Sequence, residues 1–233
     1  MSWVIVPAAG TGARFGADFP KQYQTLAGRP LIAQTLARLL AHRDIEGAMV
    51  ALAHDDAHWP TLALHFDKPV LTCIGGIDRA SSVLAALHAL PGTIADDAIV
   101  LVHDAARPCV RNDDLDRVIH AARNDAVGAL LATPVRDTLK RADAQARVVA
   151  TEPREQFWRA QTPQVFRRGA LTRALEQARA DGIAITDEAM AMERLGLQPL
   201  LVEGSEDNIK ITVATDLAWA ERILATQRNE EST

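Results

Sequence analysis

Short runs of aliphatic and β-branched residues alternate along the chain with segments whose apolar residues repeat at helical spacing. The apolar runs predict strands at residues 4–6, 48–52, 70–74, 99–102, 127–133 and 199–202. The helical spacing predicts helices at residues 31–40, 79–89, 112–122, 169–180 and 187–195, and a last helix from about residue 216. Near-continuous apolar strands separated by helices are typical of a parallel sheet covered on both faces. The predicted fold class is therefore α/β.

The alternation stops between Pro134 and Pro163. In this interval residues 140–141 and 147–151 flank a polar turn at 143–146, which predicts a β-hairpin. The segment is too short for a domain, so we expect an arm that projects from one. Two interpretations stay open: a solvent-exposed loop, or a hairpin that contacts a partner subunit.

Three further predictions concern helix caps and the end of the chain. Asn112 can cap the helix that follows it, and Thr186 can cap the helix that begins near Asp187. The last residues, 229–233, are expected to fray.

Composition narrows the classes of partner. The 233 residues are 48% hydrophobic and 24% charged, which is enough apolar surface for a substantial core. The chain carries 25 Lys and Arg against 30 Asp and Glu, and this net charge of -5 argues against a nucleic-acid or membrane-surface partner. Two cysteines are too few for a disulfide framework. With no visible signal peptide or membrane-spanning run, we expect a cytoplasmic protein.

A glycine-rich loop follows the first predicted strand. It runs from Pro7 to Gly16, carries Arg14, and is followed by Lys21. Glycines here let the backbone approach a ligand and direct N–H groups at phosphate oxygens. The loop matches neither the Walker A pattern nor the dinucleotide-binding fingerprint, because Gln22 follows Lys21 and Phe15 stands where the third glycine belongs. We therefore predict a phosphate loop of another kind. The alternative is a glycine turn with solvated charges.

A second candidate site follows the strand at 99–102. Asp104 could ligate a divalent ion or accept a hydrogen bond from a ribose hydroxyl, and Arg107 could bind a phosphate through two N–H groups. The alternative is an Asp–Arg ion pair that only shapes the loop. Gly75 and Gly76, before the helix at 79–89, could let a base lie against the backbone.

Other residues carry weaker signals. Each of the polar stretches around Thr138, Arg154, Thr162, Thr186 and Lys210 is, taken alone, more often a cap or a surface charge. His54 and His58 are predicted to be surface histidines because no acidic or cysteine partner stands at zinc spacing. Cys73, inside a strand, is predicted to lie in the core. The sequence holds no nucleophile elbow and no His-Glu-x-x-His motif.

Taken together, these motifs resemble the 2-C-methyl-D-erythritol 4-phosphate cytidylyltransferase family over nearly the whole chain. The motifs that carry the resemblance are Pro-Ala-Ala-Gly-x-Gly-x-Arg at 7–14, Pro-Lys-Gln-Tyr at 20–23, Gly-Gly-x-x-Arg-x-x-Ser-Val at 75–83, His-Asp-Ala-Ala-Arg-Pro at 103–108, Pro-Val-x-Asp-Thr at 134–138, Thr-Pro-Gln at 162–164, Ile-Thr-Asp-Glu-Ala at 185–189 and Asp-Asn-Ile-Lys at 207–210. The first is shared by many nucleotidyltransferases, whereas the set in this order is specific.

The resemblance implies a Rossmann-like nucleotidyltransferase fold. It would be a three-layer sandwich with a largely parallel sheet and a projecting β-arm, forming one domain over residues 1–233. The arm, at about 137–159, would cross to the other subunit of a homodimer, so that each active site is shared. The two substrates would be CTP and a polyol phosphate, and the cofactor Mg²⁺.

The resemblance also assigns roles to individual residues. Those matched to CTP are Pro7, Ala8, Ala9, Gly10, Thr11, Gly12, Lys21, Gly76, Ser82, Asp104, Ala105 and Lys210. Those matched to methylerythritol phosphate are Arg107, Thr138, Arg154, Thr162 and Thr186. Arg14, Lys21, Arg154 and Lys210 are the implied catalytic cations. Asp104 is the implied metal ligand.

The implied reaction joins CTP and 2-C-methyl-D-erythritol 4-phosphate to give 4-diphosphocytidyl-2-C-methyl-D-erythritol and pyrophosphate, in non-mevalonate isoprenoid precursor biosynthesis. One alternative is a cytidylyltransferase acting on ribitol 5-phosphate. Another is a non-catalytic nucleotide-binding regulatory protein, against which the retention of Arg14, Lys21 and Lys210 argues.

Overall fold

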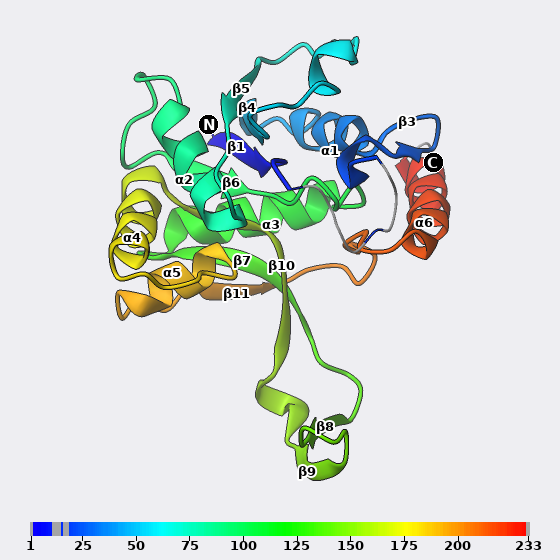
Figure 1. Cartoon of the computed structure of the whole chain (residues 1–233), viewed down its shortest axis with the longest axis vertical. Helices are drawn as coiled ribbons and strands as arrows, with labels where there is room; N and C mark the ends of the chain where they lie inside the picture. The colour runs from blue at the N-terminus through cyan, green and yellow to red at the C-terminus, as the bar shows by residue number, and fades with distance from the viewer. Residues whose placement is uncertain (1, 11–14, 16–18, 232–233) are drawn as a thin grey trace.

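The chain is built on a seven-stranded sheet with the strand order β11-β7-β10-β6-β1-β4-β5 (Figure 1). The computed structural model describes residues 2–10, 15 and 19–231. The strands are β1 (Ser2–Pro7), β4 (Ile45–Leu52), β5 (Val70–Ile74), β6 (Ile99–Val102), β7 (Gly128–Pro134), β10 (Trp158–Arg167) and β11 (Leu200–Glu203). Strand β10 is antiparallel to β6 and β7, and the other pairings in the sheet are parallel. The predicted α/β class and largely parallel sheet are confirmed.

Helices cover both faces of this sheet and give three layers (Figure 1). The alternation of side chains along β1 shows why: Val4 and Val6 join one core, and Trp3 and Ile5 join the other. Helices α1 (Leu31–Leu40) and α3 (Asn112–Asn124) pack on the first core. Helices α2 (Arg79–Ala89), α4 (Arg168–Ala180) and α5 (Glu188–Arg194) pack on the second.

A third, smaller core lies beside the sheet, and the C-terminal helix packs on it. Helix α6 (Thr215–Glu231) packs through Ala220 and Leu224 against Leu26 and Leu31. Leu26 belongs to a short antiparallel pair, β2 (Thr25–Leu26) and β3 (Arg29–Pro30). The single-turn helices η2 (Lys21–Tyr23) and η3 (Trp59–Thr61) lie in the loops that follow β1 and β4. No helix in the described part of the chain is long and apolar enough to span a membrane.

A β-hairpin projects from β7 and β10, well away from the sheet (Figure 1). It consists of β8 (Leu139–Ala142) and β9 (Val148–Glu152), followed by η4 (Arg154–Gln156). Asp143 fixes its turn by accepting hydrogen bonds from the backbone N–H groups of Gln145 and Arg147. The predicted hairpin is therefore present.

The structure corrects several local predictions. Strand β10 was not predicted. The extended Arg111, not Asn112, is the N-cap of α3, and Asp187, not Thr186, caps α5 by accepting from the N–H of Met190. Of the residues predicted to fray, 229–231 are helical because α6 continues through Glu231, and 232–233 lie outside the described residues.

Two side chains also differ in burial from the prediction. His54 is exposed as predicted, but His58 is half-buried because its ring lies against Phe19 and Tyr23. Cys73 is half-buried at the margin of the second core, on the outermost strand β5.

Candidate active site

Two adjoining cavities lie at the carboxyl ends of the parallel strands, the edge at which α/β sheets bind ligands. The larger has a volume of about 250 Å³ and is bounded by the chain that follows β1, β5 and β6. Ten residues predicted to bind the nucleotide line it: Pro7, Ala8, Ala9, Gly10, Lys21, Gly76, Ser82, Asp104, Ala105 and Lys210. The predicted residues Thr11, Gly12 and Arg14 lie outside the described residues.

The smaller cavity, of about 180 Å³, lies between the end of β6, strand β10 and the start of α5. It is lined by Arg107, Thr162 and Thr186, three of the residues predicted to contact the polyol phosphate. The other two, Thr138 and Arg154, are exposed on the projecting arm and line neither cavity of the described chain. The structure therefore brings together only part of the predicted acceptor site within one chain.

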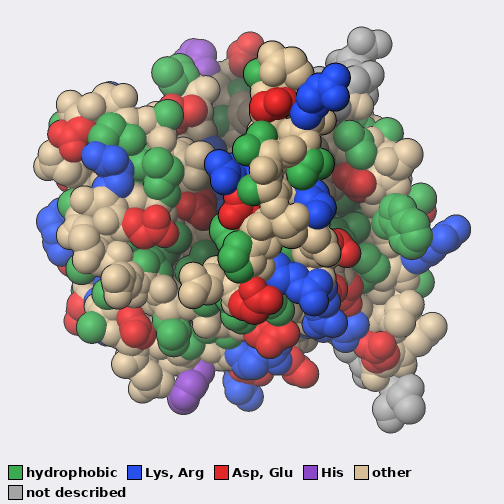
Figure 2. All heavy atoms as spheres, turned by 90° about the horizontal axis from the view of Figure 1, so that it is seen from below, with side chains coloured by type: hydrophobic (Ala, Val, Ile, Leu, Met, Phe, Trp, Pro, Cys, Tyr) green, Lys and Arg blue, Asp and Glu red, His purple; other side chains and the backbone are tan. Residues whose placement is uncertain are grey.

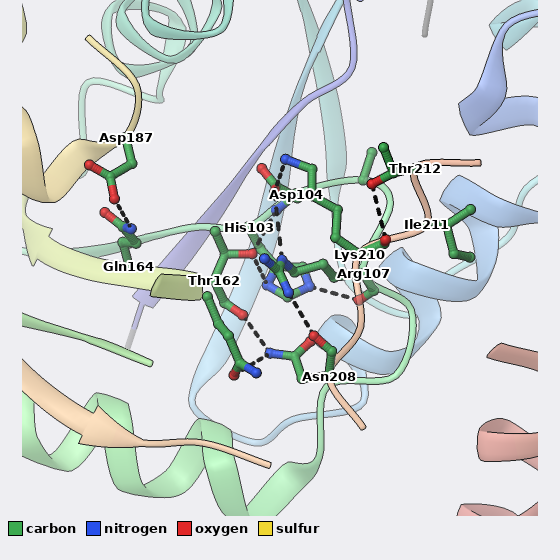
Figure 3. Close-up of polar contacts among 12 residues, drawn as sticks. His103, Asp104, Arg107, Thr162, Gln164, Asp187, Asn208, Lys210, Ile211 and Thr212 are labelled. Carbon is green, nitrogen blue, oxygen red and sulfur yellow. Dashed lines mark hydrogen bonds and ion pairs between the residues drawn. The ribbon is translucent and has the colours of Figure 1, made fainter. Parts of the chain in front are cut away.

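Asp104 stands between the two cavities and is surrounded by cations (Figure 3). Its Oδ2 atom is 2.7 Å from Nζ of Lys210 and 3.6 Å from Nε of Arg107, and its Oδ1 atom is 3.0 Å from Nε of Arg79. Burial alone would raise the pKa of Asp104, but these three cations hold it well below its usual range. Asp104 is therefore a fixed anion. Asp104 and Arg107 form the ion pair that was the alternative to a binding role. Both residues also line the smaller cavity.

A chain of hydrogen bonds holds the Asp104 backbone in place (Figure 3). Nε2 of His103 donates to the carbonyl oxygen of Arg107, at 2.9 Å, so its Nδ1 accepts from the hydroxyl of Thr162, at 3.1 Å. The Thr162 oxygen in turn accepts from the N–H of Asp104, at 3.1 Å. Burial lowers the pKa of His103 to about 4, so the imidazole is neutral near pH 7 and the chain of donors is maintained. Thr162 thus supports the site from the buried part of β10, and is not the cap or surface position that its stretch alone suggested.

Small residues shape the opposite wall of the larger cavity. A Cβ atom at Gly76 would lie 2.2 Å from Cβ of Ser81, so only glycine fits there. The N–H of Gly76 donates to the Ser82 hydroxyl oxygen, at 3.1 Å, and that hydroxyl donates to the carbonyl of Asp78, at 2.8 Å. These bonds close the turn before α2 tightly and leave its backbone facing the cavity.

Lys21 and Lys210 reach the larger cavity from different parts of the chain. Nζ of Lys21 donates to the carbonyl oxygen of Ile211, at 2.8 Å, one residue beyond Lys210. The segment that carries Lys210 is fixed by Asn208, which is fully buried and donates to the carbonyl of Thr162 at 2.8 Å. Two positive groups therefore converge on one wall of the cavity, where they could neutralise phosphate charge.

Comparison with known proteins identifies the family. The family model for 2-C-methyl-D-erythritol 4-phosphate cytidylyltransferase matches residues 2–226. The chain belongs to this family. The predicted family and enzyme class, a nucleotidyltransferase, are confirmed.

Individual family members resemble the chain over nearly its whole length. A 2-C-methyl-D-erythritol 4-phosphate cytidylyltransferase of Stenotrophomonas maltophilia (strain R551-3) is 58% identical, covering 96% of each chain. One of Xanthomonas campestris pv. campestris (strain 8004) is 59% identical over 96% of this chain and 84% of its own.

Solved structures of family members share the fold. A crystal structure of 4-diphosphocytidyl-2C-methyl-D-erythritol synthase superposes with a TM-score of 0.82 and 36% identity, over 96% of this chain and 97% of its own. The Francisella tularensis family member gives a TM-score of 0.82 at 34% identity, covering 95% of this chain and 99% of its own. The predicted nucleotidyltransferase fold is confirmed.

Two residues of the site, Arg79 and Glu188, received no role from the sequence. The Arg79 guanidinium contacts Glu188 and Asp104, and Glu188 is 1% exposed. Both lie inside motifs that carry the family resemblance, Gly-Gly-x-x-Arg and Ile-Thr-Asp-Glu-Ala. The motifs alone contain no sign that the two side chains meet.

The donor set around Asp104 fits Mg²⁺ only together with a phosphorylated ligand. The described residues contain no group of three or more His, Cys, Asp or Glu side chains that could enclose a metal ion. Mg²⁺ commonly binds one or two carboxylates and completes its octahedron with water and substrate phosphates. Asp104, ionised and on the wall of both cavities, can supply that single carboxylate.

Proposed function

We propose that this protein transfers the cytidylyl group of CTP to 2-C-methyl-D-erythritol 4-phosphate, a step in isoprenoid precursor biosynthesis. The observation that carries the proposal is the pair of adjoining cavities with a shared cationic wall, in a chain of this family. CTP would occupy the larger cavity and the polyol phosphate the smaller one. Their phosphates would then meet beside Asp104 and Lys210.

The chemistry needs positioning and charge neutralisation more than a nucleophilic side chain. The acceptor phosphate is already anionic near neutral pH, and one of its oxygens attacks the α-phosphorus of CTP. A new P–O bond forms, the bond from the α-phosphorus to the bridging oxygen breaks, and pyrophosphate leaves with its electron pair. Arg14, Lys21 and Lys210 would stabilise the charge that builds up on the phosphoryl oxygens.

Mg²⁺ held by Asp104 and the CTP phosphates would screen the repulsion between the two anionic substrates. Asp104 can serve in this way because its cations keep it ionised. The same cations hold its carboxylate at a fixed place between the cavities.

The acceptor pocket would be completed by the arm of a second copy of the chain. Arg107, Thr162 and Thr186 would contact the acceptor from one subunit, and Thr138 and Arg154 from the arm of the other. In support, the arm carries the exposed apolar side chains Val148, Val149, Phe157 and Trp158, which a partner surface could bury. Residues 1–233 then form one nucleotidyltransferase domain with a dimerisation arm at about 137–159.

Pyrophosphate release tests the proposed function. The purified protein should release pyrophosphate when given CTP, 2-C-methyl-D-erythritol 4-phosphate and Mg²⁺. It should release almost none when the acceptor is omitted, when ATP, GTP or UTP replaces CTP, or when EDTA removes the metal. Absence of release under the complete conditions would instead favour a non-catalytic nucleotide-binding protein.

A further inference from the structure

The wall shared by the two cavities contains an ionic cluster whose two carboxylates, Asp104 and Glu188, are buried. Arg79, Asp104 and Lys210 line both cavities, and Glu188 lies directly behind Arg79. We propose that Arg79, clamped by Glu188, is a positioning residue that fixes Asp104 between the two substrates and couples the two pockets. This inference rests on the proposed function and adds two residues to it.

The contacts show that Arg79 is fully engaged by carboxylates. Its Nη1 and Nη2 atoms donate to the two carboxylate oxygens of Glu188, at 2.5 and 3.0 Å. Its Nε donates to Oδ1 of Asp104, at 3.0 Å. This arrangement requires the planar fork of arginine, because a lysine ammonium group cannot present two parallel donors to one carboxylate and a third to another. With both Nη atoms held by Glu188, Arg79 is placed to orient Asp104 and not to bind a phosphate directly.

The charges explain why Glu188 is required. Three cations, Arg79, Arg107 and Lys210, face Asp104. Glu188 balances the positive charge of Arg79, so Asp104 still attracts Lys210. Without that carboxylate, Arg79 would compete for Asp104 and for incoming phosphates. The side chain of Glu188 is 1% exposed and that of Arg79 24%, so water screens this pair only weakly.

The same pair joins the structural elements that build the two pockets. Arg79 is the first residue of α2, which carries Ser82 of the larger cavity. Glu188 is the first residue of α5, two residues after Thr186 of the smaller cavity. The α5 start is further fixed by Gln164, which donates to Asp187 at 2.9 Å and accepts from the N–H of Ala189 at 2.8 Å. Movement of either helix start would therefore be transmitted to Asp104.

Steady-state kinetics with three variants and one control test this inference. Glu188→Gln keeps the side-chain shape and removes the charge, and Arg79→Lys keeps the charge and removes the fork. The double variant Arg79→Met with Glu188→Leu replaces the buried pair by apolar side chains, a change that often preserves stability. Glu176→Gln removes an exposed contact to His88 between α4 and α2, outside both cavities, and serves as the control.

We expect each of the three variants to lower kcat by about 10- to 100-fold, because displacement of a reacting group by about an ångström has effects of this size. The KM values for CTP and for the acceptor should change less than about threefold. The double variant should keep a wild-type melting temperature and still lose kcat, and Glu176→Gln should match the wild type.

Two results would overturn the inference. One is a double variant that recovers wild-type kcat, because the pair would then only stabilise the fold. The other is a folded Glu188→Gln protein with wild-type kcat. Failure of the proposed function has a different signature, since the wild-type protein itself would then make no product.

Discussion

At the scale of single residues, the site depends on one carboxylate that is shared among several cations. Asp104 is 2.7 Å from Lys210 and 3.0 Å from Arg79. Lys210 is 39% exposed and faces both cavities, so it can turn from Asp104 to a phosphate when substrate binds. Arg79 is held by both Glu188 and Asp104 and cannot turn toward a phosphate in this way. We therefore expect Lys210 and Arg79 to have different roles.

Substitution of Lys210 tests this division. Lys210→Ala should lower kcat by on the order of 10²–10³, the usual cost of removing one donor that stabilises transition-state charge. Arg79 and Arg107 remain beside Asp104, so the melting temperature should change little. Steady-state pyrophosphate release gives kcat, and Lys68→Ala, whose Nζ donates to the carbonyl of His42 away from both cavities, is the control. A kcat near the wild-type value would remove Lys210 from the reaction.

The buried thiol of Cys109 predicts how stability depends on alkaline pH. It is fully buried and donates to the carbonyl of Ala220, with an Sγ–O distance of 3.8 Å. Burial, reinforced by the charge of Asp207, raises the pKa of Cys109 to about 12, against about 8.5 in the unfolded chain. Between these values the unfolded chain has lost a proton that the folded chain keeps, so stability falls as pH rises through this window.

Urea unfolding at pH 8 and pH 10 measures this effect. The wild type should lose about 1–2 kcal/mol more than Cys109→Ala between the two pH values. Other alkaline titrations, including that of Tyr23, affect both proteins alike and cancel in the comparison. Equal losses in the two proteins would contradict the prediction.

At the scale of elements, a hydrogen bond outside the cavities supports the segment that carries Lys21. In η2 the hydroxyl of Tyr23 donates to Oδ2 of Asp56, at 2.5 Å, and burial raises the pKa of Tyr23 above its usual range, so the donor proton is retained. Gln22, buried beside it, donates to the carbonyl of Ala8 at 2.9 Å and so connects η2 to the loop after β1.

Removal of the Tyr23 hydroxyl should weaken this attachment. We expect Tyr23→Phe to cost about 1–2 kcal/mol, which for a chain of this size lowers the melting temperature by about 2–8 °C. The ring, which packs on Phe19 and His58, stays in place. Thermal unfolding monitored by circular dichroism measures the change. An unaltered melting temperature would show that the hydrogen bond does not stabilise the segment.

Elements with a regular apolar pattern could be predicted from the sequence, and elements held by polar contacts could not. Strand β1 alternates between two cores, and helices such as α1 repeat at helical spacing. Strand β10 has Pro163 in its middle and buried polar residues around it, which is typical of a loop. Its polar side chains are satisfied only by distant residues: Thr162 by the N–H of Asp104, and Gln164 by Asp187.

The candidate site divides in the same way. The positions of Gly10, Asp104 and Lys210 at the cavity could be predicted because a family motif or the end of a strand marks them. The pairing of Arg79 with Glu188 joins residues 109 positions apart in sequence. Only the tertiary fold, in which α2 and α5 both pack against α4, brings them together, and no local pattern encodes that contact.

At the scale of the whole molecule, the projecting arm is the part of the chain that we expect a second copy to contact. Seen from the arm side, basic and acidic side chains are interspersed (Figure 2). Several pair locally: Arg141 with Glu152 on the arm, and Arg159 with Glu206 at its base. With these charges paired, we expect the exposed Val148 and Val149 to be among the apolar side chains that a second copy would bury.

Mixed dimers test whether the arm serves the partner's site. Arg154→Ala and Lys210→Ala should each be nearly inactive alone. In a dimer of one chain of each kind, the core with intact Lys210 meets the arm with intact Arg154, so one of two sites is complete. Random assembly puts half of the dimers in this state, and we expect about a quarter of wild-type activity after co-expression. Light scattering should confirm the dimer. An inactive mixture would place Arg154 in its own chain's site, and a fully active Arg154→Ala protein would place it outside any site.

Competition between two acceptors shows which polyol phosphate this protein uses. The protein is supplied with CTP, Mg²⁺ and equal concentrations of 2-C-methyl-D-erythritol 4-phosphate and ribitol 5-phosphate, and the products are identified by mass. We expect 4-diphosphocytidyl-2-C-methyl-D-erythritol to predominate, with one pyrophosphate released for each molecule formed. A product consisting mainly of CDP-ribitol would contradict this expectation.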